Sequence, residues 1–328
     1  MVNLRRLKNK IKFSIPPRKY VFASVALTSR FPIGTHVMDE DWDVLVVLDT
    51  CRTDAMQDVA SEYSFIDEVD RIWSRGAHSV EWMSHTFDRK WEKELSSTAL
   101  ISANPFAKVV LDQDLQDTER DAANRLRKLG DWDLITSEDL GHVEYVWQYD
   151  TDTPAVRELK EKEYLPKHVT FPKPVTDRGI DTWRNRDGID RMILHYWQPH
   201  KPFIANAIEE KRPLRDYEYK FFEYLKDTDD WETVYSTFLD ELRFALDSVK
   251  VLLRNIDAED VVITADHGEA MGEFGDYNHQ MGLLNPYVRF VPWVETSATD
   301  RRTRDPDTEL TEREGYSVDE RLSALGYK

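Results

Sequence analysis

The stretch that decides the fold is Val261-Val262-Ile263-Thr264-Ala265-Asp266-His267-Gly268-Glu269. A short apolar, β-branched run is typical of a strand that is buried on both faces of a parallel sheet. Sheets of this kind bind ligands just beyond the carboxyl ends of their strands. Asp266 and His267 follow the run and offer an oxygen and an imidazole nitrogen, which suit a divalent metal ion. Gly268 would let the chain turn closely there. A plain strand end capped by an Asp turn explains the same residues.

A second run, from Asp43 to Asp49, has the same character, because an unbroken apolar segment ends in a carboxylate. A lone Asp at such a place is often only a helix cap, but two strands that end in metal-type ligands favour a site. Further strands are expected at 99–102, 142–147, 192–196 and 288–294, and a long amphipathic helix at 233–256 leads into the Asp266 strand. Helix followed by strand is the repeat unit of a parallel sheet. We therefore expect an α/β fold with a mostly parallel central sheet flanked by helices.

Two segments between these strands carry candidate chemistry. Ser79 opens a stretch with helix-forming character, where a serine is either an N-cap or a hydroxyl among exposed amides that favour an anion. His195 to Phe203 forms a strand end and a loop that Pro199 and Pro202 restrain, and it contains His200 and Lys201. A structural and a functional role for these histidines are equally open at this point. The segment from Asp150 to Pro174 is rich in proline and charge and is expected to be a long surface connection.

The chain of 328 residues carries a formal net charge of −18. This charge argues against a nucleic-acid-binding protein, which needs a basic surface. It also suggests a halophilic protein, because high salt screens self-repulsion. Cys51 is the single cysteine, so no disulfide framework and no cysteine-rich zinc site can form within the chain, and a cytoplasmic location is expected.

The amino-terminal segment differs from the rest, because it contains basic residues but no acidic residue before Asp39. The first of them are Arg5, Arg6, Lys8, Lys10, Lys12, Arg18 and Lys19, with Leu4, Leu7 and Ile11 at helical spacing among them. Residues 1–19 could contact an anionic membrane peripherally, on its inner face, or form a basic tail that folds back on the acidic body. The apolar run at 21–27 is too short to span a bilayer, and no export signal is recognised. The expected division is a basic segment (1–38), a catalytic domain (39–299) and a charged carboxyl-terminal segment (300–328).

The order of these motifs resembles the alkaline phosphatase superfamily, in particular its sulfatase-like branch. The segments that carry the resemblance are Thr264 to Glu269 with Gly272, Glu273 and His279, Tyr196 to Phe203, and the terminal Ala324-Leu325-Gly326-Tyr327. The similarity covers about 43–294, and it is loose around Ser79. It implies a three-layer α/β sandwich and an enzyme that hydrolyses or transfers phosphate or sulfate esters. The substrate would be a small molecule, a glycan or a lipid head group.

The resemblance also implies roles for single residues. Asp49, Asp266 and His267 would hold one divalent metal ion, and Ser79 would be the nucleophile. The residues that contact the ester's oxygens or assist its leaving group would be His200, His279 and His195. Asn104 and Lys201 are candidate substrate-binding residues. Ser74, Thr50 and Cys51 compete with Ser79 as possible nucleophiles.

Three departures from the family pattern refine the hypothesis. Asp49 is followed by Thr50 instead of a second acid, so a calcium-type site is disfavoured, and manganese or zinc suits the mixed ligands better than calcium or magnesium. Ser79 lacks the setting in which sulfatases form formylglycine, which favours phosphoryl over sulfuryl transfer, with a phosphodiesterase among the options. No second metal-ligand set is found, which also disfavours a two-metal mutase. The alternative is a degenerate member that keeps the fold as a binding or scaffold protein.

Overall fold

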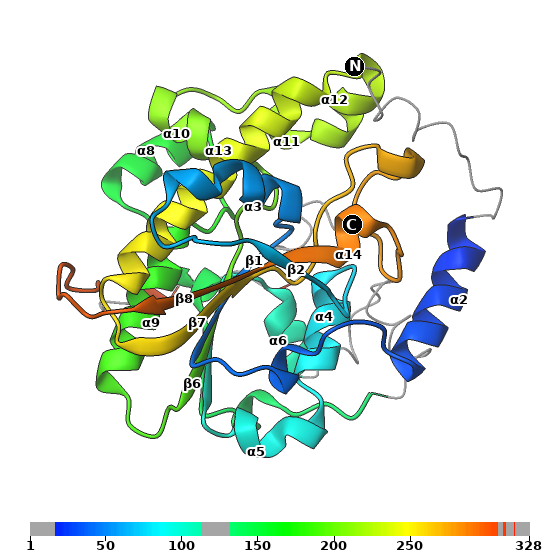
Figure 1. Ribbon diagram of the computed structural model, residues 1–328. Helices are drawn as coiled ribbons and strands as arrows, with labels where there is room; N and C mark the ends of the chain where they lie inside the picture. The colour runs from blue at the N-terminus through cyan, green and yellow to red at the C-terminus, as the bar shows by residue number, and fades with distance from the viewer. Residues whose placement is uncertain (1–16, 113–131, 308–310, 313–317, 319–328) are drawn as a thin grey trace.

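The structure is a computed structural model and describes residues 17–112, 132–307, 311–312 and 318. Its centre is a sheet of seven strands in the order β2-β8-β7-β1-β6-β3-β4 (Figure 1). The strands are β1 (Val44–Leu48), β2 (Asp70–Trp73), β3 (Thr98–Ser102), β4 (His142–Tyr145), β6 (Arg191–Tyr196), β7 (Ala258–Thr264) and β8 (Phe290–Ala298). The run from β7 to β4 is parallel throughout, whereas β8 is antiparallel to β7 and β2 is antiparallel to β8. The expected mostly parallel sheet is confirmed.

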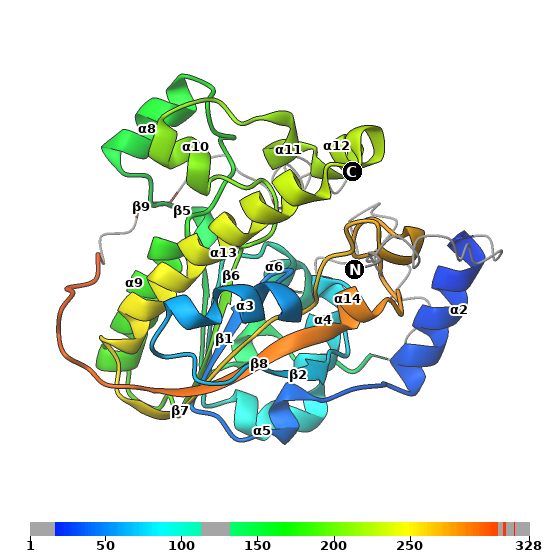
Figure 2. The ribbon, with the colours of Figure 1, turned by 45° about the horizontal axis from the view of Figure 1, so that its top comes forward.

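Helices cover both faces of the sheet and make the expected three layers (Figures 1 and 2). One face carries α3 (Thr53–Val59), α9 (Pro172–Asn185) and α13 (Trp231–Leu253), and the other carries α4 (Ser79–Thr86), α5 (Glu92–Leu95) and α6 (Phe106–Leu111). The remaining helices are α2 (Pro17–Arg30), α8 (Pro154–Glu161), α10 (Ala205–Glu210), α11 (Asp216–Tyr219), α12 (Phe221–Thr228) and α14 (Pro286–Arg289). A small second sheet pairs β5 (Tyr149–Asp150) with β9 (Thr311–Glu312).

The pattern of β1 explains the two halves of the core. Val44, Val46 and Leu48 belong to the apolar cluster under α3, α9 and α13, whereas Leu45 and Val47 belong to the cluster under α4 and α6. Successive side chains of a strand point to opposite faces, so an unbroken apolar run is needed where both faces are covered. All five side chains are completely buried, as the sequence predicted for this strand.

One expectation about a connection is wrong. The segment 150–174 contains α8 and the start of α9, and is not a continuous surface loop. Thr153 caps α8, because its hydroxyl accepts a hydrogen bond from the Val156 amide, and Pro154 is the first residue of the helix. A proline is tolerated in the first turn because its missing amide hydrogen would have had no partner there.

The amino-terminal expectations fall largely outside the described residues. Residues 1–16 of the proposed basic segment 1–19, with Leu4, Leu7 and Ile11, lie outside the described residues, whereas 17–19 begin α2. The Ala324 to Tyr327 motif follows residue 318 and also lies outside them. Within the described part of the chain, no helix is both long and apolar enough to cross a membrane. The strands of the main sheet lie between Val44 and Ala298, within the proposed catalytic domain of residues 39–299, whose boundaries stay a prediction.

Candidate active site

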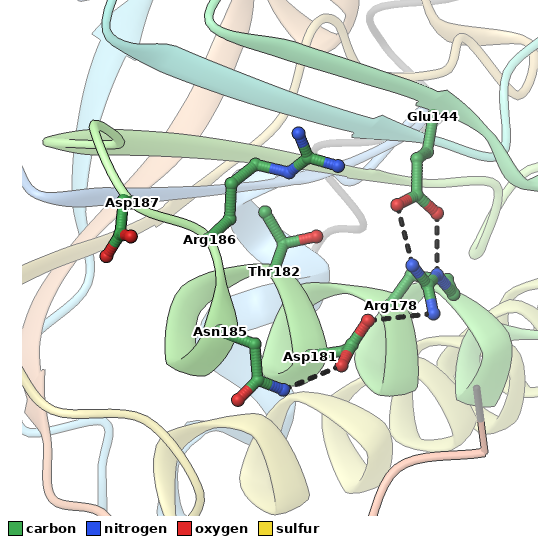
Figure 3. Close-up of a pocket in the computed structure, with 7 residues that line it drawn as sticks. All are labelled: Glu144, Arg178, Asp181, Thr182, Asn185, Arg186 and Asp187. Carbon is green, nitrogen blue, oxygen red and sulfur yellow. Dashed lines mark hydrogen bonds and ion pairs between the residues drawn. The ribbon is translucent and has the colours of Figure 1, made fainter.

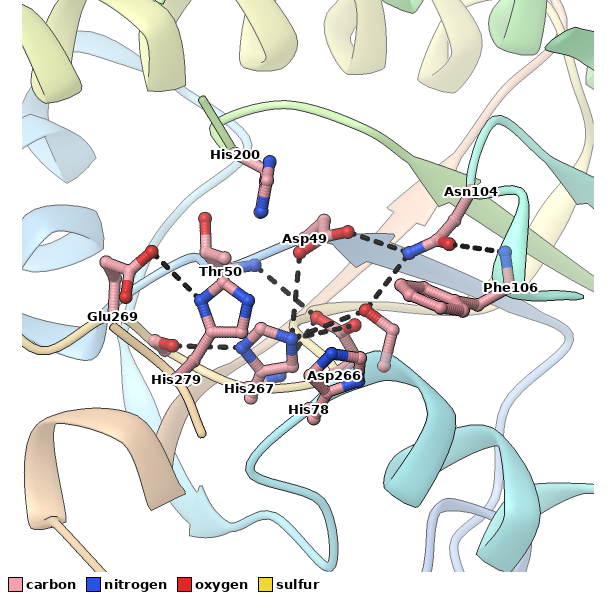
Figure 4. Close-up of polar contacts among 12 residues, drawn as sticks. Asp49, Thr50, His78, Asn104, Phe106, His200, Asp266, His267, Glu269 and His279 are labelled. Carbon is pink, nitrogen blue, oxygen red and sulfur yellow. Dashed lines mark hydrogen bonds and ion pairs between the residues drawn. The ribbon is translucent and has the colours of Figure 1, made fainter. Parts of the chain in front are cut away.

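The sequence-predicted site residues meet at the carboxyl edge of the sheet (Figure 4). Asp49 directly follows β1, Asp266 lies two residues beyond β7, and Asn104 lies two residues beyond β3. These strands are parallel neighbours or next neighbours, with β6 between β1 and β3. Their ends therefore converge on one place, as expected for an open α/β sheet.

Two carboxylates and two imidazoles form the buried centre of the site. Asp49, His195 and Asp266 each offer a ligand atom within 4.8 Å of the others. Nε2 of His267 lies 3.4 Å from Oδ2 of Asp266 and 3.8 Å from Oδ1 of Asp49, and Nε2 of His195 lies 3.5 Å from the same Asp266 oxygen. All four side chains are fully buried. The structure thus brings the proposed ligands Asp49, Asp266 and His267 together and adds His195 to them.

Close approach of the chain behind the site requires a glycine. The Gly268 amide donates to the Val288 carbonyl oxygen over 2.7 Å. A Cβ atom at this position would lie 2.2 Å from the Tyr287 carbonyl oxygen, which is a severe clash. Gly268 therefore lets the strand that carries Asp266 and His267 pack directly against the start of α14.

Ser79 is the first residue of α4, and His78 is the residue that caps this helix. Nδ1 of His78 accepts a hydrogen bond from the Val80 amide over 3.2 Å. The sequence left open whether Ser79 is itself the cap. Because an imidazole performs that role, the Ser79 hydroxyl is available to the site.

The Ser79 hydroxyl is held by two neighbours. Nδ2 of Asn104 donates to Oγ of Ser79 over 3.0 Å and to Oδ2 of Asp49 over 2.8 Å. The other amide atom of Asn104, Oδ1, accepts from the Phe106 amide, which fixes the orientation of the side chain. Nε2 of His267 lies 3.3 Å from Oγ of Ser79. Asn104, predicted to bind substrate, is here a bridge between the nucleophile candidate and a metal-ligand candidate.

The backbone and a carboxylate set the tautomers of three site histidines. Nδ1 of His267 lies 2.9 Å from the Gly268 carbonyl oxygen, and Nδ1 of His200 lies 2.7 Å from the Lys201 carbonyl oxygen. Nδ1 of His279 lies 3.0 Å from Oε2 of Glu269. A carbonyl oxygen or a carboxylate accepts only, so each Nδ1 carries the hydrogen and Nε2 is the basic nitrogen. The neutral rings can therefore act as ligands or bases, and they must first be protonated before they can donate to a leaving group.

Electrostatics at the site favours neutral imidazoles and disfavours the bare pair of carboxylates. Burial lowers the pKa values of His267, His200 and His279 below the ordinary value of 6.5. Burial, together with the charges of Asp266 and Glu269, raises the pKa of Asp49 well above its usual range. Burial also opposes ionisation of Asp266, but the neighbouring His267 and His195 hold the pKa of that carboxyl below its usual range. A cation between the carboxylates would relieve their repulsion.

The unpaired atoms of the centre fit such a cation. Among the described residues, buried atoms without a hydrogen-bond partner include Oδ1 of Asp49, Oδ2 of Asp266 and both ring nitrogens of His195. Such atoms cost free energy unless a ligand satisfies them. Their chemistry is mixed oxygen and nitrogen, which suits zinc or manganese better than magnesium or calcium. The residues present therefore fit a divalent metal ion.

His200 and His279 lie next to this centre. The ring of His279 stacks on that of His267, with centroids 4.4 Å apart, and the ring of His200 lies 5.3 Å from that of His279. The Lys201 ammonium group lies over the Phe222 ring, and its charge lowers the pKa values of His200 and His279. His200 and His279 are thus at the site, on the side away from Asn104 (Figure 4).

Sequence reasoning assigned no role to two residues of the site, His78 and Glu269, and it named a third, Thr50, only as a possible nucleophile. His78 lies against His267 and His279, with ring centroids 6.2 and 5.6 Å away. Thr50 has a φ angle of 64°, which is uncommon for a β-branched residue, and its buried hydroxyl has no partner among the described residues. Glu269, which pairs with His279, was quoted as part of a motif without a role. Only its place in that motif could have pointed to Glu269, and nothing local distinguishes His78.

A buried ion pair ties the site to neighbouring segments. The Glu81 carboxylate accepts from Arg289 over 3.0 Å and from the backbone amides of Ala77 and Gly282. Both side chains of the pair are 1% exposed. Since Glu81 lies on α4 just after Ser79, this network holds the helix that presents Ser79 against the loop that follows His279.

A separate hollow of about 350 Å³ lies elsewhere on the molecule (Figure 3). Its lining side chains pair with one another, because Arg178 contacts both Glu144 and Asp181, and Asn185 donates to Asp181. Its lining residues are Glu144, Arg178, Asp181, Thr182, Asn185, Arg186 and Asp187. None of the sequence-predicted site residues is among them.

Comparison with known proteins gives structural neighbours only. No family model matches the sequence, and no curated protein matches it. The chain is similar to the soluble domain of lipooligosaccharide phosphoethanolamine transferase A from Neisseria meningitidis, at 14% identity and a TM-score of 0.48, over 79% of this chain and 77% of that one. The complete integral membrane protein is similar at 14% identity and a TM-score of 0.47, over 80% of this chain and 48% of that one.

A third similar structure is the zinc complex of the carboxyl-terminal periplasmic domain of EptC from Escherichia coli, at 10% identity and a TM-score of 0.43, over 81% of this chain and 75% of that one. Sulfatases and a phosphonate monoester hydrolase are also among the similar structures. At these identities and scores, the likeness does not assign an activity to this chain. The similar structures are thus named as phosphoethanolamine transferases, sulfatases and a phosphonate monoester hydrolase.

Proposed function

We propose that this protein is a metal-dependent enzyme that hydrolyses or transfers phosphate esters, with Ser79 as the nucleophile. One observation carries the proposal. The Ser79 hydroxyl, held by Asn104, lies beside the buried carboxylates Asp49 and Asp266 and the imidazole of His267. A hydroxyl in such a setting has little structural purpose, because its helix is capped by another residue. It is a suitable arrangement for nucleophilic catalysis.

Asp49, Asp266 and His267 would hold the metal ion, with His195 as a further candidate ligand. When bound there, a divalent ion would favour the ionised form of the Ser79 hydroxyl and neutralise charge that develops on the transferring group. The remaining roles belong to the side chains themselves. Asn104 donates to Oγ of Ser79 and so fixes the position of that oxygen. The hydrogen bonds of their Nδ1 atoms fix the ring orientations of His200, His267 and His279.

The reaction is an in-line displacement at phosphorus. The bond between Oγ of Ser79 and phosphorus forms as the bond to the departing alcohol breaks, and the hydroxyl proton is lost to solvent water. The alcohol leaves with a proton, which His200 or His279 can supply after taking it up from solvent. Water then releases phosphate from the phosphoserine in hydrolysis, and a second hydroxyl takes the phosphoryl group in transfer. Ser79 is restored in both cases.

Phosphate esters are preferred over sulfate esters for a chemical reason. An unmodified serine forms a phosphoryl intermediate that water can cleave, whereas the corresponding sulfate ester is hard to release. Lys201, whose charge acts on the site histidines, is suited to contact the anionic ester. A small molecule, a glycan or a lipid head group would carry the phosphate. A cytoplasmic location with peripheral membrane contact through residues 1–19, and a halophilic character, are part of the same proposal.

The test is a panel of esters assayed with the purified protein. Aryl phosphate, phosphodiester, phosphonate and sulfate esters are compared with added manganese or zinc, at low and at molar salt. We expect turnover of a phosphate ester that a chelator abolishes and manganese or zinc restores. If the purified protein contains no stoichiometric metal and shows no turnover at either salt concentration, the enzymatic proposal is refuted. The alternative, a degenerate member that acts as a binding or scaffold protein, would then be favoured.

A further inference from the structure

Helix α2 stands at the side of the molecule, next to α4 and the loop that follows His279 (Figures 1 and 2). One of its faces is anchored. The Ser24 hydroxyl donates to the Gly282 carbonyl oxygen, the Thr28 hydroxyl lies 3.2 Å from Oε1 of Glu81, and Val25 is 2% exposed in the apolar cluster under α4. The position of α2 is therefore set by specific contacts with the body of the protein.

The last turn of this helix and the residues that follow it carry exposed apolar side chains. Leu27 is 54% exposed, Phe31 is 68% exposed and Ile33 is 51% exposed. In the described part of the chain, the other large apolar side chains with comparable exposure are Tyr219 and Leu284. These three residues lie within seven positions of one another, and we call them the apolar patch. Exposed apolar residues grouped in this way mark a surface for binding.

The amino-terminal sequence that contains this patch has the opposite charge to the rest of the protein. Arg30 lies within it and is exposed, and the preceding sequence brings the cations between Arg5 and Lys19. Every acidic residue of the chain comes after position 38, and the whole chain has a net charge of −18. Cations beside exposed aromatic and aliphatic side chains suit an anionic bilayer, where the apolar groups enter the acyl boundary and the cations meet head groups.

We propose that Leu27, Phe31 and Ile33 insert into an anionic membrane and, together with the exposed Arg30, dock the protein on it. This inference extends the proposed contact of residues 1–19 and supplies its apolar part. A polybasic segment or a small apolar group alone binds weakly and reversibly, and stable attachment takes two signals. A second copy of the chain is a poorer occupant, because the patch is small for a stable dimer and like charges would face each other.

The test is co-sedimentation of the full chain with vesicles. Phosphatidylcholine vesicles with phosphatidylglycerol as the minor component are compared with vesicles of phosphatidylcholine alone. We expect binding to the anionic vesicles that weakens with salt. The triple variant Leu27→Ser, Phe31→Ser, Ile33→Ser should bind at least about tenfold more weakly, whereas Tyr219→Ser, an exposed aromatic on α11, should bind as the wild type does. Phe31→Trp should preserve binding, because tryptophan favours the membrane interface.

Several results would overturn the docking surface. They are equal binding by the triple variant, binding that does not depend on phosphatidylglycerol, no vesicle binding by the wild type, or a concentration-dependent dimer in light scattering that the triple variant loses. Circular dichroism and thermal unfolding show whether the triple variant is folded. Turnover of a soluble phosphate ester without vesicles is measured in parallel and should be unchanged in the triple variant, so that failure of docking is distinguished from failure of the proposed catalysis.

Discussion

The Ser79 hydroxyl oxygen lies 3.3 Å from Nε2 of His267, although the two residues are 188 positions apart in the chain. One comes from the first turn of α4 and the other from the turn after β7. They come into contact because α4 begins at the carboxyl edge of the sheet, where β7 ends. The proposed chemistry depends on this contact, and the first predictions test it.

Replacing the nucleophile should abolish turnover and leave the metal site intact. Ser79→Ala removes the attacking oxygen, so we expect at least about a thousandfold lower kcat on the best phosphate ester, with unchanged metal content by elemental analysis. Ser84→Ala is the matched control, because Ser84 lies on the same helix and its hydroxyl donates to the Val80 carbonyl oxygen. Retained activity in Ser79→Ala would show that another group attacks.

Removing a carboxylate should remove the metal ion. In Asp266→Asn, a fully buried charged ligand candidate becomes neutral, so we expect metal affinity to fall by at least about a hundredfold. Isothermal titration with zinc and manganese measures it. The melting temperature of the wild type should rise with added metal, and that rise should disappear in the variant. Asp181→Asn, in the separate hollow, is the control, and unchanged affinity in Asp266→Asn would contradict the assigned site.

Asn104 should act on the rate of the reaction more than on substrate binding. Its amide donates to both Ser79 and Asp49, so Asn104→Ala releases both atoms at once. We expect kcat to fall by about a hundredfold with a smaller change in KM. Asn104→Asp keeps the acceptor for the Phe106 amide but loses the donor and adds a charge, so it should be equally impaired. A variant that raises only KM would instead support the original substrate-binding role.

The buried carboxyl of Glu241 should make stability depend on pH. Its Oε2 accepts from the amides of Ile204 and Ala205, but burial raises its pKa from 4.5 to about 8. The folded state therefore holds this proton more tightly than the unfolded state does. The protonated carboxyl therefore stabilises the folded state fully below about pH 4.5, and this stabilisation is lost as the pH rises from there through about 8.

The comparison of wild type with Glu241→Gln isolates this effect. Relative to the variant, the wild type should lose up to about 1.4 kcal/mol of unfolding free energy per pH unit between those two values. Urea unfolding of both proteins at a series of pH values measures the difference. A difference in stability that stays constant with pH would show that Glu241 does not hold a proton in the folded protein.

The ion pair of Glu81 and Arg289 should be costly to break from one side. Arg289→Met leaves the Glu81 carboxylate buried without its charge partner, so we expect a loss of about 3–5 kcal/mol in unfolding free energy. Arg302→Met is the control, because the Arg302 side chain is 82% exposed. Denaturant unfolding of both variants provides the measurement, and equal stabilities would show that the pair contributes nothing.

Local pattern in the sequence was enough for the sheet and for part of the site. The apolar runs before Asp49 and Asp266 predicted buried parallel strands. A strand needs apolar side chains throughout only where helices cover both faces of its sheet. The same logic placed the candidate ligands at one edge of the sheet. The helix at 231–253 was visible from its apolar stripe. The helix in 154–161 was missed, because proline and charge suggested a loop where they in fact begin a helix.

The tertiary structure alone decided which polar groups meet. No periodicity in the sequence shows that Asn104 bridges Ser79 and Asp49, that His78 caps the helix in place of Ser79, or that His195 lies with the carboxylates. These contacts join residues on different strands and depend on how far each loop folds back over the edge of the sheet. The chain itself determines the strands and the side chains available at their ends, through short-range pattern and burial. Packing of distant segments determines their distances, and the proposed chemistry depends on those distances.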